Sequence, residues 1–262
     1  MDTTFTAVAA AAVVGAAVGT ACTASRNAHA GPSQDPWSPR PNAGRGPKLK
    51  RVPELSSAVS YTYVCEPYSG KIPPAAAGRE TRVLHCLRHA QGTHNVAVAT
   101  EGEKAYSNWK YRDARLTPAG IDQAKTAIPT WRKLTFDSIL VSPLSRCLQT
   151  AVTAIPSGAG KMFATELIRE RYGLNPCDLR REKSELTKEF PGVNFSPLEN
   201  ETDNLWTPER EPLPTLQKRA NDFLAFVFES NECGKTVGVV THNDFLTMLL
   251  YDSALIMGPR CE

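Results

Sequence analysis

The stretch Thr81–Asn95, TRVLHCLRHAQGTHN, joins a short apolar run to a dense group of polar side chains. The run Thr81–Leu87 has the length and the apolar character that are typical of a buried strand. Arg88 and His89 follow it directly, and His94 lies in the loop beyond them. Because ligands of open α/β sheets bind at the carboxyl ends of the strands, this stretch predicts both a central strand and a binding edge.

The rest of the chain alternates between strand and helix patterns. Thr117 and Pro118 are typical of a helix start, because threonine caps free backbone N–H groups and proline fits the first turn. Alternating strands and helices indicate a mainly parallel sheet covered on both faces, so we predict a three-layer α/β/α fold. The predicted strands cover residues 81–87, 136–142, 161–168 and 235–242, and the predicted helices cover residues 116–134, 144–155, 215–230 and 243–255.

Composition divides the sequence into three segments. Residues 1–30 are rich in Ala and Val, residues 31–77 resemble a Pro/Gly-rich linker, and residues 78–262 carry the α/β pattern. The first segment has an apolar core of signal-peptide length and a small-x-small cleavage pattern at Ala28–Ala30, but Asp2 and a lack of early basic residues depart from that pattern. Secretory targeting, organellar targeting and an unaddressed tail on a cytoplasmic protein all remain open. We expect membrane contact only where this segment is retained.

The overall composition excludes some classes of protein. The 262 residues carry a formal net charge of only +3, which is too balanced to indicate a nucleic-acid binder. The seven cysteines are scattered and include no CxxC pair, so they predict neither a disulfide framework nor a zinc ribbon. Cys86 falls within a strand pattern and Cys147 within a helix pattern, and we expect both to be buried free thiols.

Four polar side chains from distant parts of the chain are predicted to meet at one edge of the sheet. Arg88 and His89 follow the first strand, and His242 follows the last one. Arg146 lies in the first turn of the helix after the strand at 136–142. Arginine presents a planar fork that suits phosphate oxygens, and histidine can form a covalent intermediate. This combination indicates a phosphate pocket with a histidine nucleophile.

A metal site is the rival interpretation of the histidines. His85, His89 and His94 lie along a strand and a loop, and the sequence has no HExxH helix that would present two imidazoles on one face. We therefore expect no metal and no cofactor. His85 is predicted to pack within the strand, whereas the role of His94 stays open.

Several blocks of the sequence resemble the histidine phosphatase superfamily. LRHAQGTHN is similar to the RHG signature of its branch 1, in the form found in phosphoglycerate-mutase-like proteins of plants and fungi. Five further blocks follow in the family's order, so the resemblance spans about residues 80–250. They are DARLTPAGIDQA (113–124), VSPLSRCLQTA (141–151), LIRERYGLNPCDLRR (167–181), FSPLENETDNLWTPEREP (195–212) and VVTHNDFL (239–246).

The resemblance implies a role for each matching residue. His89 would be the nucleophile that forms a phosphohistidine, and His242 would complete the pocket and stabilise charge in the transition state. Glu170 stands at the position of the general acid and base, with Glu166 as the less favoured alternative; this role needs a carboxyl group whose pKa is raised by burial. The phosphate oxygens would be bound by Arg88, Asn95, Arg146 and His242.

Three functions are compatible with these residues. The leading prediction is a metal-independent phosphatase that hydrolyses a phosphomonoester. The alternatives are a phosphoglycerate-type phosphomutase and a regulatory or binding member of the same fold with weak catalysis. The expected partner is a small phosphorylated substrate or a phosphoprotein, and no nucleic acid is expected.

A few features depart from the resemblance or stay undecided. Asp244 stands where relatives commonly have glycine, and its carboxylate is expected either to oppose a substrate phosphate or to cap a helix and face solvent. The short C-terminus is expected to leave out a closing edge strand. Arg180 and Arg181 are interpreted either as a rim for a second phosphate or as a solvated basic patch. Trp206 is expected to pack rather than to stack on substrate, and the sequons at Asn194 and Asn200 matter only in the secretory pathway.

Overall fold

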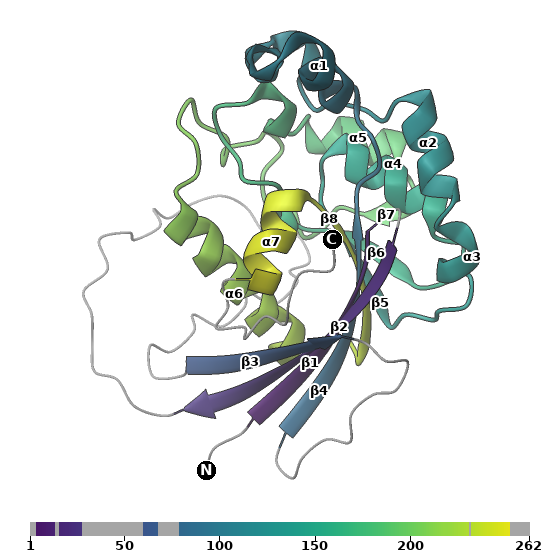
Figure 1. The fold of residues 1–262 in the computed structure, drawn as a ribbon, viewed down its shortest axis with the longest axis vertical. Helices are drawn as coiled ribbons and strands as arrows, with labels where there is room; N and C mark the ends of the chain where they lie inside the picture. The colour runs from purple at the N-terminus through teal and green to yellow at the C-terminus, as the bar shows by residue number, and fades with distance from the viewer. Residues whose placement is uncertain (1–3, 14–15, 28–59, 68–78, 231, 252–262) are drawn as a thin grey trace.

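The protein is described by a computed structural model that covers residues 4–13, 16–27, 60–67, 79–230 and 232–251. Its described residues form an eight-stranded sheet in the order β3-β2-β1-β4-β8-β5-β6-β7, with helices on both sides (Figure 1). The strands are β1 Thr4–Val13, β2 Ala16–Asn27, β3 Ser60–Pro67, β4 Arg79–Arg88, β5 Ser138–Val141, β6 Lys161–Ala164, β7 Val193–Asn194 and β8 Thr236–Thr241. The helices are α1 Thr93–Glu101, α2 Pro118–Lys125, α3 Ile128–Trp131, α4 Ser145–Ala154, α5 Lys183–Glu189, α6 Leu213–Glu229 and α7 Asn243–Tyr251; the 3₁₀ turns are η1 Glu103–Ser107, η2 Trp109–Tyr111, η3 Glu166–Ile168 and η4 Pro176–Asp178.

The sheet is mainly parallel, as predicted. Strands β1, β4, β8, β5, β6 and β7 pair in parallel, so their carboxyl ends meet at one edge. Among the strands of the described ranges, the β1–β2 and β2–β3 pairs are antiparallel. The sheet therefore ends at β3 on one side and at β7 on the other.

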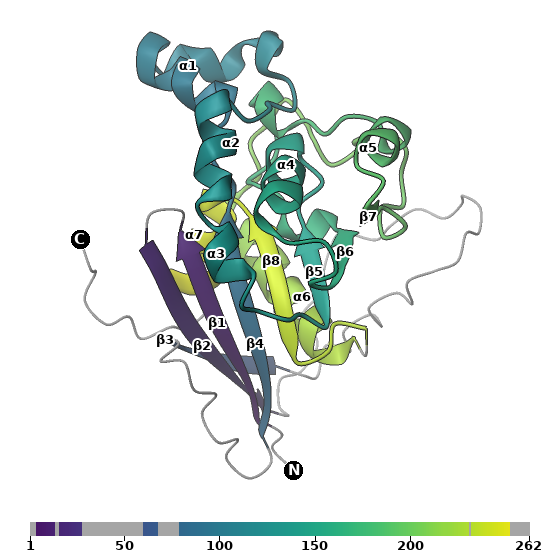
Figure 2. The ribbon, with the colours of Figure 1, turned by 90° about the vertical axis from the view of Figure 1, so that its right-hand side faces the viewer.

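Alternation along the strands builds the three layers. Leu84 and Cys86 of β4 point to the face that is covered by α6 and α7 and join the core cluster of Phe223 and Phe245. Leu87 points to the opposite face and joins the core under α3 and α4, which includes Trp131. Figure 2 shows α6 behind the sheet and α2, α3 and α4 in front of it. The predicted α/β/α layering is confirmed.

Two predicted elements differ in their extent. The predicted strand 161–168 ends at Ala164, because Thr165 caps the following 3₁₀ turn and its hydroxyl accepts a hydrogen bond from the N–H of Leu167 at 3.3 Å. The predicted helix 116–134 divides into α2 and α3. Pro129 explains the division, since it has no N–H to donate to a carbonyl one turn earlier. The predicted helix 243–255 is described as far as Tyr251.

The first two sequence segments contain strands that the sequence analysis did not predict. Strands β1 and β2 fall within residues 1–30, and β3 falls within the predicted linker 31–77. The remainder of that linker lies outside the described residues, and the three-segment division stays a prediction. Among the helices of the described ranges, none is both long and apolar enough to cross a bilayer.

Candidate active site

Three neighbouring strands end at the same place and supply the first polar residues of the site. Strands β4, β8 and β5 lie side by side, and the residues that follow β8 and β5 are His242 and Ser142. Arg88 ends β4, and the N–H of His89 donates to the carbonyl of Thr241 at 2.9 Å. The sheet register thus brings His89 beside His242 although they are far apart in the sequence.

The loop after β4 is shaped so that His94 folds back over the strand end. A Cβ on Gly92 would lie only 2.6 Å from Nδ1 of His94, so glycine gives the imidazole the room it needs. The N–H of Gly92 donates to Oδ1 of Asn95 at 2.8 Å, and this contact fixes the start of α1. Asn95 therefore has its oxygen engaged in the loop, and its Nδ2 amide is the donor that is left for a ligand.

Three imidazoles gather at this strand end. The ring centroid of His89 lies 5.1 Å from that of His242 and 5.9 Å from that of His94. Burial lowers the pKa of all three rings, and the nearby Arg146 lowers it further. The pKa of His94 falls to about 2, and those of His89 and His242 fall well below their usual value. All three rings are therefore neutral near pH 7.

Hydrogen bonding selects one tautomer for His89. Nδ1 lies 2.8 Å from the carbonyl oxygen of Ala90, and a carbonyl oxygen can only accept. Nδ1 therefore carries the proton, and Nε2 keeps its lone pair. A neutral imidazole with a free Nε2 lone pair is the form that can attack an electrophile.

His242 is held on one side by two side chains. Its Nε2 lies 2.7 Å from the hydroxyl of Ser142 and 3.3 Å from Sγ of Cys147. Cys147 is completely buried, as predicted, and burial raises the pKa of its thiol. These contacts fix the orientation of the imidazole.

Arg146 is positioned by a cap on the helix that carries it. The buried carboxylate of Asp113 accepts from the N–H of Ser145 at 2.8 Å and from its hydroxyl at 2.5 Å, so it caps the start of α4. Arg146 follows in the first turn and is 1 % exposed. Its guanidinium donates to the carbonyl of Cys177 at 2.6 Å and to Oδ1 of Asp178 at 2.8 Å.

Several buried side-chain nitrogens have no hydrogen-bond partner among the described residues, and three of them lie in this region, whereas Nε of Arg169 lies in the neighbouring ion network. The three belong to side chains of the strand edge: Nε of Arg88, Nε of Arg146 and Nδ1 of His94. Buried polar groups in folded proteins are nearly always hydrogen-bonded, so the unpaired Nε donors of Arg88 and Arg146 indicate a place for an acceptor such as a phosphate oxygen. We refer to Arg88, His89, His94, Arg146 and His242 together as the histidine pocket.

Glu170 adds a carboxyl group to this region. Its Oε1 accepts from the backbone N–H of Arg171 and from that of Asp244, each at 3.0 Å. Burial raises the pKa of Glu170 to about 7, and the charges of Asp244 and Asp178 raise it as well. Because Oε1 already accepts two hydrogen bonds, the proton of the neutral form resides on Oε2. This is the protonation that a general acid needs near neutral pH.

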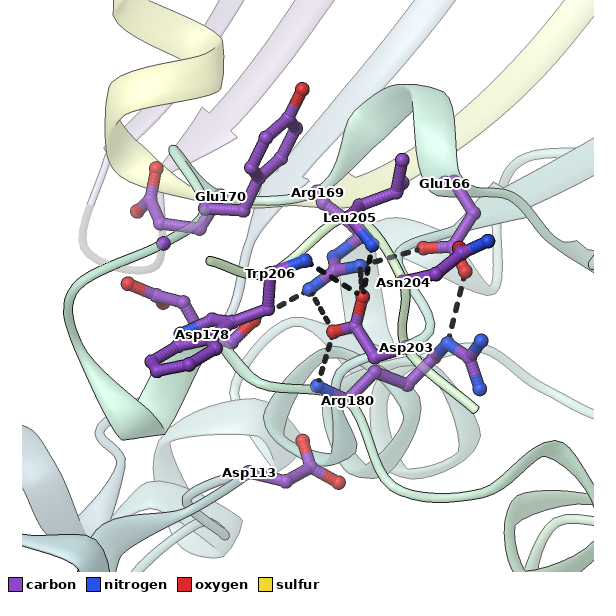
Figure 3. A network of polar contacts seen from close by, with 12 residues as sticks. Asp113, Glu166, Arg169, Glu170, Asp178, Arg180, Asp203, Asn204, Leu205 and Trp206 are labelled. Carbon is purple, nitrogen blue, oxygen red and sulfur yellow. Dashed lines mark hydrogen bonds and ion pairs between the residues drawn. The ribbon is translucent and has the colours of Figure 1, made fainter. Parts of the chain in front are cut away.

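The alternative acid, Glu166, has a different environment. Its carboxylate pairs with Arg180 at 2.9 Å and with Arg169 at 3.1 Å. Figure 3 shows Glu166 on the opposite side of Arg169 from Glu170. Glu166 therefore belongs to a structural ion network, and the geometry favours Glu170.

Neither interpretation, a phosphate rim or a solvated patch, fits Arg180, whereas Arg181 is partly exposed and its predicted role stays open. Arg180 is 1 % exposed, and each of its side-chain N–H groups has an acceptor. Arg181 pairs with Asp113 at 3.0 Å and with Glu189 at 2.8 Å. The acceptors of Arg180 are Glu166 Oε1 and the carbonyls of Arg181, Asn200, Glu201 and Thr202.

Two other side chains pack as expected. His85 is buried on β4 and lies edge-on to Phe136, with ring centroids 5.5 Å apart. Trp206 donates from its indole nitrogen to the carbonyl of Asn175 at 3.0 Å and packs edge-on against Trp109.

Sequence reasoning missed residues that hold the site together. Ser142, Asp178 and Arg210 were not predicted, although Ser142 stands directly after a predicted strand and offered a local signal. Asp178 ends the 3₁₀ turn η4 and Arg210 lies in a loop, and their roles depend on contacts between distant segments. Within the described ranges, no cluster of three or more His, Cys, Asp or Glu side chains is arranged to hold a metal ion.

Comparison with known proteins gives consistent results. The chain is 34 % identical over 205 residues to a phosphoglycerate mutase-like protein of Arabidopsis thaliana, which covers 64 % of this chain and 73 % of the relative. It is 33 % identical over 205 residues to phosphoglycerate mutase-like protein 1 of the same plant, over 63 % of this chain and 69 % of the relative. Among solved structures, an alpha-ribazole phosphatase from Shigella flexneri aligns with a TM-score of 0.44 and 22 % identity, over 63 % of this chain and 75 % of that one.

The family match covers well over half of the sequence. Residues 84–256 match the family described as the histidine phosphatase superfamily, branch 1. The matched range runs from β4 through α7 and includes every residue of the histidine pocket and Glu170. The chain belongs to branch 1 of the histidine phosphatase superfamily.

Proposed function

We propose that this chain is a metal-independent phosphatase that hydrolyses a phosphomonoester through a phosphohistidine on His89. The observation that carries the proposal is the His89 tautomer, in which Nδ1 donates to Ala90 and Nε2 is free. The same imidazole has a lowered pKa because of burial and the charge of Arg146, so protonation does not block Nε2 near pH 7.

The unpaired donors of the histidine pocket support phosphate binding. Nε of Arg88 and Nε of Arg146 are buried without partners among the described residues, and both can donate to phosphate oxygens. The Nδ2 amide of Asn95 and the imidazole of His242 would complete the ring of donors. Fixed donors stabilise the charge that develops on the phosphoryl oxygens during transfer, because they need no reorganisation.

Glu170 provides the proton that the leaving oxygen needs. In the first step Nε2 of His89 bonds to phosphorus, the phosphorus–oxygen ester bond breaks, and Oε2 of Glu170 gives its proton to the leaving oxygen. In the second step water attacks phosphorus, Glu170 takes the proton back, and the nitrogen–phosphorus bond breaks. Inorganic phosphate leaves, and both side chains return to their starting forms.

A phosphomutase is the second candidate, because the two Arabidopsis relatives are named phosphoglycerate mutase-like. The same phosphohistidine would then pass its phosphoryl group to a hydroxyl of the product instead of to water. The substrate of either reaction is proposed to be a small phosphorylated molecule or a phosphoprotein. Which acceptor is used decides between the two candidates.

The test is phosphate release from a panel of phosphomonoesters in the presence of EDTA. We expect the wild type to release phosphate and His89→Ala to lose at least a thousandfold of this activity, on the order of the loss when a nucleophile is removed. His85→Gln is the matched control, because His85 packs outside the pocket and should keep activity. Activity that survives in His89→Ala would exclude His89 as the nucleophile.

A coupled phosphoglycerate mutase assay on the same proteins separates the two candidates. Transfer of the phosphoryl group to the phosphoglycerate product, without release of inorganic phosphate, would favour the mutase. Neither reaction from a folded wild type would favour the binding role.

A further inference from the structure

Two aspartates face the acid Glu170, and one arginine joins them. Nη1 of Arg210 lies 2.7 Å from Oδ2 of Asp178, and its Nη2 lies 3.7 Å from Oδ2 of Asp244. Oδ1 of Asp178 also accepts a hydrogen bond from Nη2 of Arg146, a member of the histidine pocket, at 2.8 Å. A row of alternating charges therefore runs from Arg146 through Asp178 and Arg210 to Asp244.

The two aspartates of this row differ in burial and in how closely they are paired. The Asp178 side chain is 3 % exposed and accepts short hydrogen bonds from two guanidinium groups, which is a strong, charge-assisted arrangement. The Asp244 side chain is 43 % exposed, and its separation from Arg210 exceeds a hydrogen bond. The Asp244 carboxylate can therefore be neutralised without leaving a buried charge unpaired, whereas the Asp178 carboxylate cannot.

Asp244 touches the acid through its backbone and acts on it through its side chain. The Asp244 N–H donates to Oε1 of Glu170 at 3.0 Å, so the start of α7 fixes the carboxyl group in place. The Asp244 carboxylate belongs to the same residue and places a negative charge beside the acid. Replacing Asp244 with asparagine removes this charge and leaves the backbone N–H in position.

We propose that Asp244, held by Arg210, is a positioning residue whose negative charge keeps Glu170 protonated and so adapts the enzyme to esters with strongly basic leaving oxygens. This inference rests on the proposed function, in which Glu170 protonates the leaving oxygen. An alkyl phosphate needs that proton when its ester bond breaks. An aryl phosphate such as p-nitrophenyl phosphate needs it much less, because its leaving oxygen is a weak base.

The charges around Glu170 support this role. After burial, the Asp244 charge is the largest cause that raises the pKa of Glu170, and the Asp178 charge follows, while Arg146 lowers it. A second carboxylate close by disfavours ionisation of the first. The Tyr106 hydroxyl also faces the group, and its own pKa is raised, so it adds no charge near neutral pH. The groups that face Glu170 are Asp244 of α7, Asp178 of η4, Arg146 of α4, Tyr106 of η1, and the Arg219–Glu211 pair, of which Arg219 contacts the Glu170 carbonyl.

The test compares the pH dependence of kcat/KM for the wild type and Asp244→Asn. With glycerol phosphate, the alkaline limb should move to lower pH by about half a unit to one unit, so kcat/KM at about pH 8 falls three- to tenfold. At about pH 5.5 the two proteins should agree within about twofold, because Glu170 is protonated in both. With p-nitrophenyl phosphate the difference should shrink at every pH.

Two further variants separate this effect from general damage. Arg210→Gln removes the cation that offsets Asp244, so its alkaline limb should move to higher pH, opposite to Asp244→Asn. Asp222→Asn is the matched control, because Asp222 pairs with Lys218 on α6 and does not face Glu170. Superimposed profiles for the wild type and Asp244→Asn would overturn the proposal, and so would shifts of the same sign in Asp244→Asn and Arg210→Gln.

A measurement without turnover distinguishes a failure of this inference from a failure of the proposed function. Glu170→Gln should raise the urea midpoint at about pH 8, and this gain should be smaller when Asp244→Asn is already present. An equal gain in both backgrounds would overturn the role of Asp244 whatever reaction the protein performs. If His89→Ala keeps phosphatase activity while the two gains differ, the proposed function fails and the coupling between Asp244 and Glu170 stands.

Discussion

The molecule uses buried arginines in two contrasting ways. In the cluster of Glu166, Arg169, Arg180 and Asp203, which we call the Arg180 cluster, every side-chain N–H of Arg180 has an acceptor. Figure 3 shows Asp203 between the guanidinium of Arg169 and the backbone of Arg180. In the histidine pocket, by contrast, Arg88 has a buried Nε without a partner among the described residues.

The difference concerns how fully each arginine is paired within the chain. A buried charge is tolerated when partners are built around it. In the Arg180 cluster, Asp203 and Glu166 bind the Nη groups of Arg169, although its buried Nε has no partner within the described residues. In the histidine pocket, the Nε donors of Arg88 and Arg146 are unpaired within the described residues, and the three imidazoles add no positive charge near pH 7. Under the proposed function, an anionic substrate would be the partner that binds these donors. Mutations in the first region should affect stability, and mutations in the second should affect binding and turnover.

The largest effect on stability is expected for Asp203→Asn. The Asp203 carboxylate accepts hydrogen bonds from Nη1 of Arg169 at 2.9 Å and from Nη2 at 2.6 Å, and both side chains are almost completely buried. Removing the charge leaves Arg169 without its main counter-ion, so the free energy of unfolding should fall by about 3–5 kcal/mol. Urea denaturation followed by circular dichroism measures this loss. A loss below about 1 kcal/mol would show that the Arg180 cluster does not hold these loops.

Glu170→Gln should have the opposite effect on stability. The pKa of Glu170 in the folded protein is raised to about 7, so the folded state holds the proton more tightly than the unfolded chain does. The free energy of unfolding of the wild type should therefore decline as the pH rises from about 4.5 to about 7, by up to about 3 kcal/mol.

Glutamine does not titrate, so Glu170→Gln should be more stable than the wild type above about pH 7 and similar to it below about pH 4.5. Its turnover of an alkyl phosphate should fall by about a hundredfold to ten-thousandfold. Thermal melts across this pH range and initial rates test both statements together. A stability difference that does not vary with pH would contradict the raised pKa.

Arg88→Met tests the histidine pocket without disturbing a partner. Because Nε of Arg88 has no hydrogen bond within the described structure, its loss should change the melting temperature little. Losing a charge-assisted hydrogen bond to a phosphate should weaken substrate binding by about 1.5–3 kcal/mol, which is roughly ten- to a hundredfold in kcat/KM. A strong loss of stability with unchanged kinetics would place Arg88 among the structural arginines instead.

The smallest effect is expected for Asp222→Asn. The Lys218–Asp222 pair on α6 lies at 2.9 Å, but the lysine side chain is 70 % exposed. Such a surface pair contributes only about 0.3–0.5 kcal/mol. Urea denaturation should therefore barely distinguish this variant from the wild type, and a loss comparable to that of Asp203→Asn would remove the contrast between buried and exposed carboxylates.

Local patterns in the sequence predicted the parts of the fold that local chemistry decides. The run at 81–87 predicted β4, and its position relative to β8 predicted that His89 and His242 would meet. The break between α2 and α3 could also have been predicted, because Pro129 lacks the N–H that a continuous helix needs. Strands β1 to β3 were not predicted, because the small residues of β1 and β2 resemble a targeting segment as closely as a strand.

The contacts of Arg180 and Asp178 were beyond local patterns. The segment CDLRR is equally typical of a surface patch and of a buried network. The structure decides between them through backbone carbonyls about twenty residues away, which accept hydrogen bonds from Arg180. The same holds for Asp244 of α7, because its role depends on the distant Arg210. Side chains that act through long-range partners are therefore the ones that the sequence could not assign.

The most direct test of the account is to trap the phosphohistidine. The wild type would be mixed with a labelled phosphomonoester, quenched in alkaline denaturant, which preserves phosphohistidine, and digested for mass spectrometry. The account predicts one phosphoryl group on the peptide that contains His89 and none on the same peptide of His89→Ala. Labelling of another residue, or turnover with no labelled His89 at any quench time, would contradict the account.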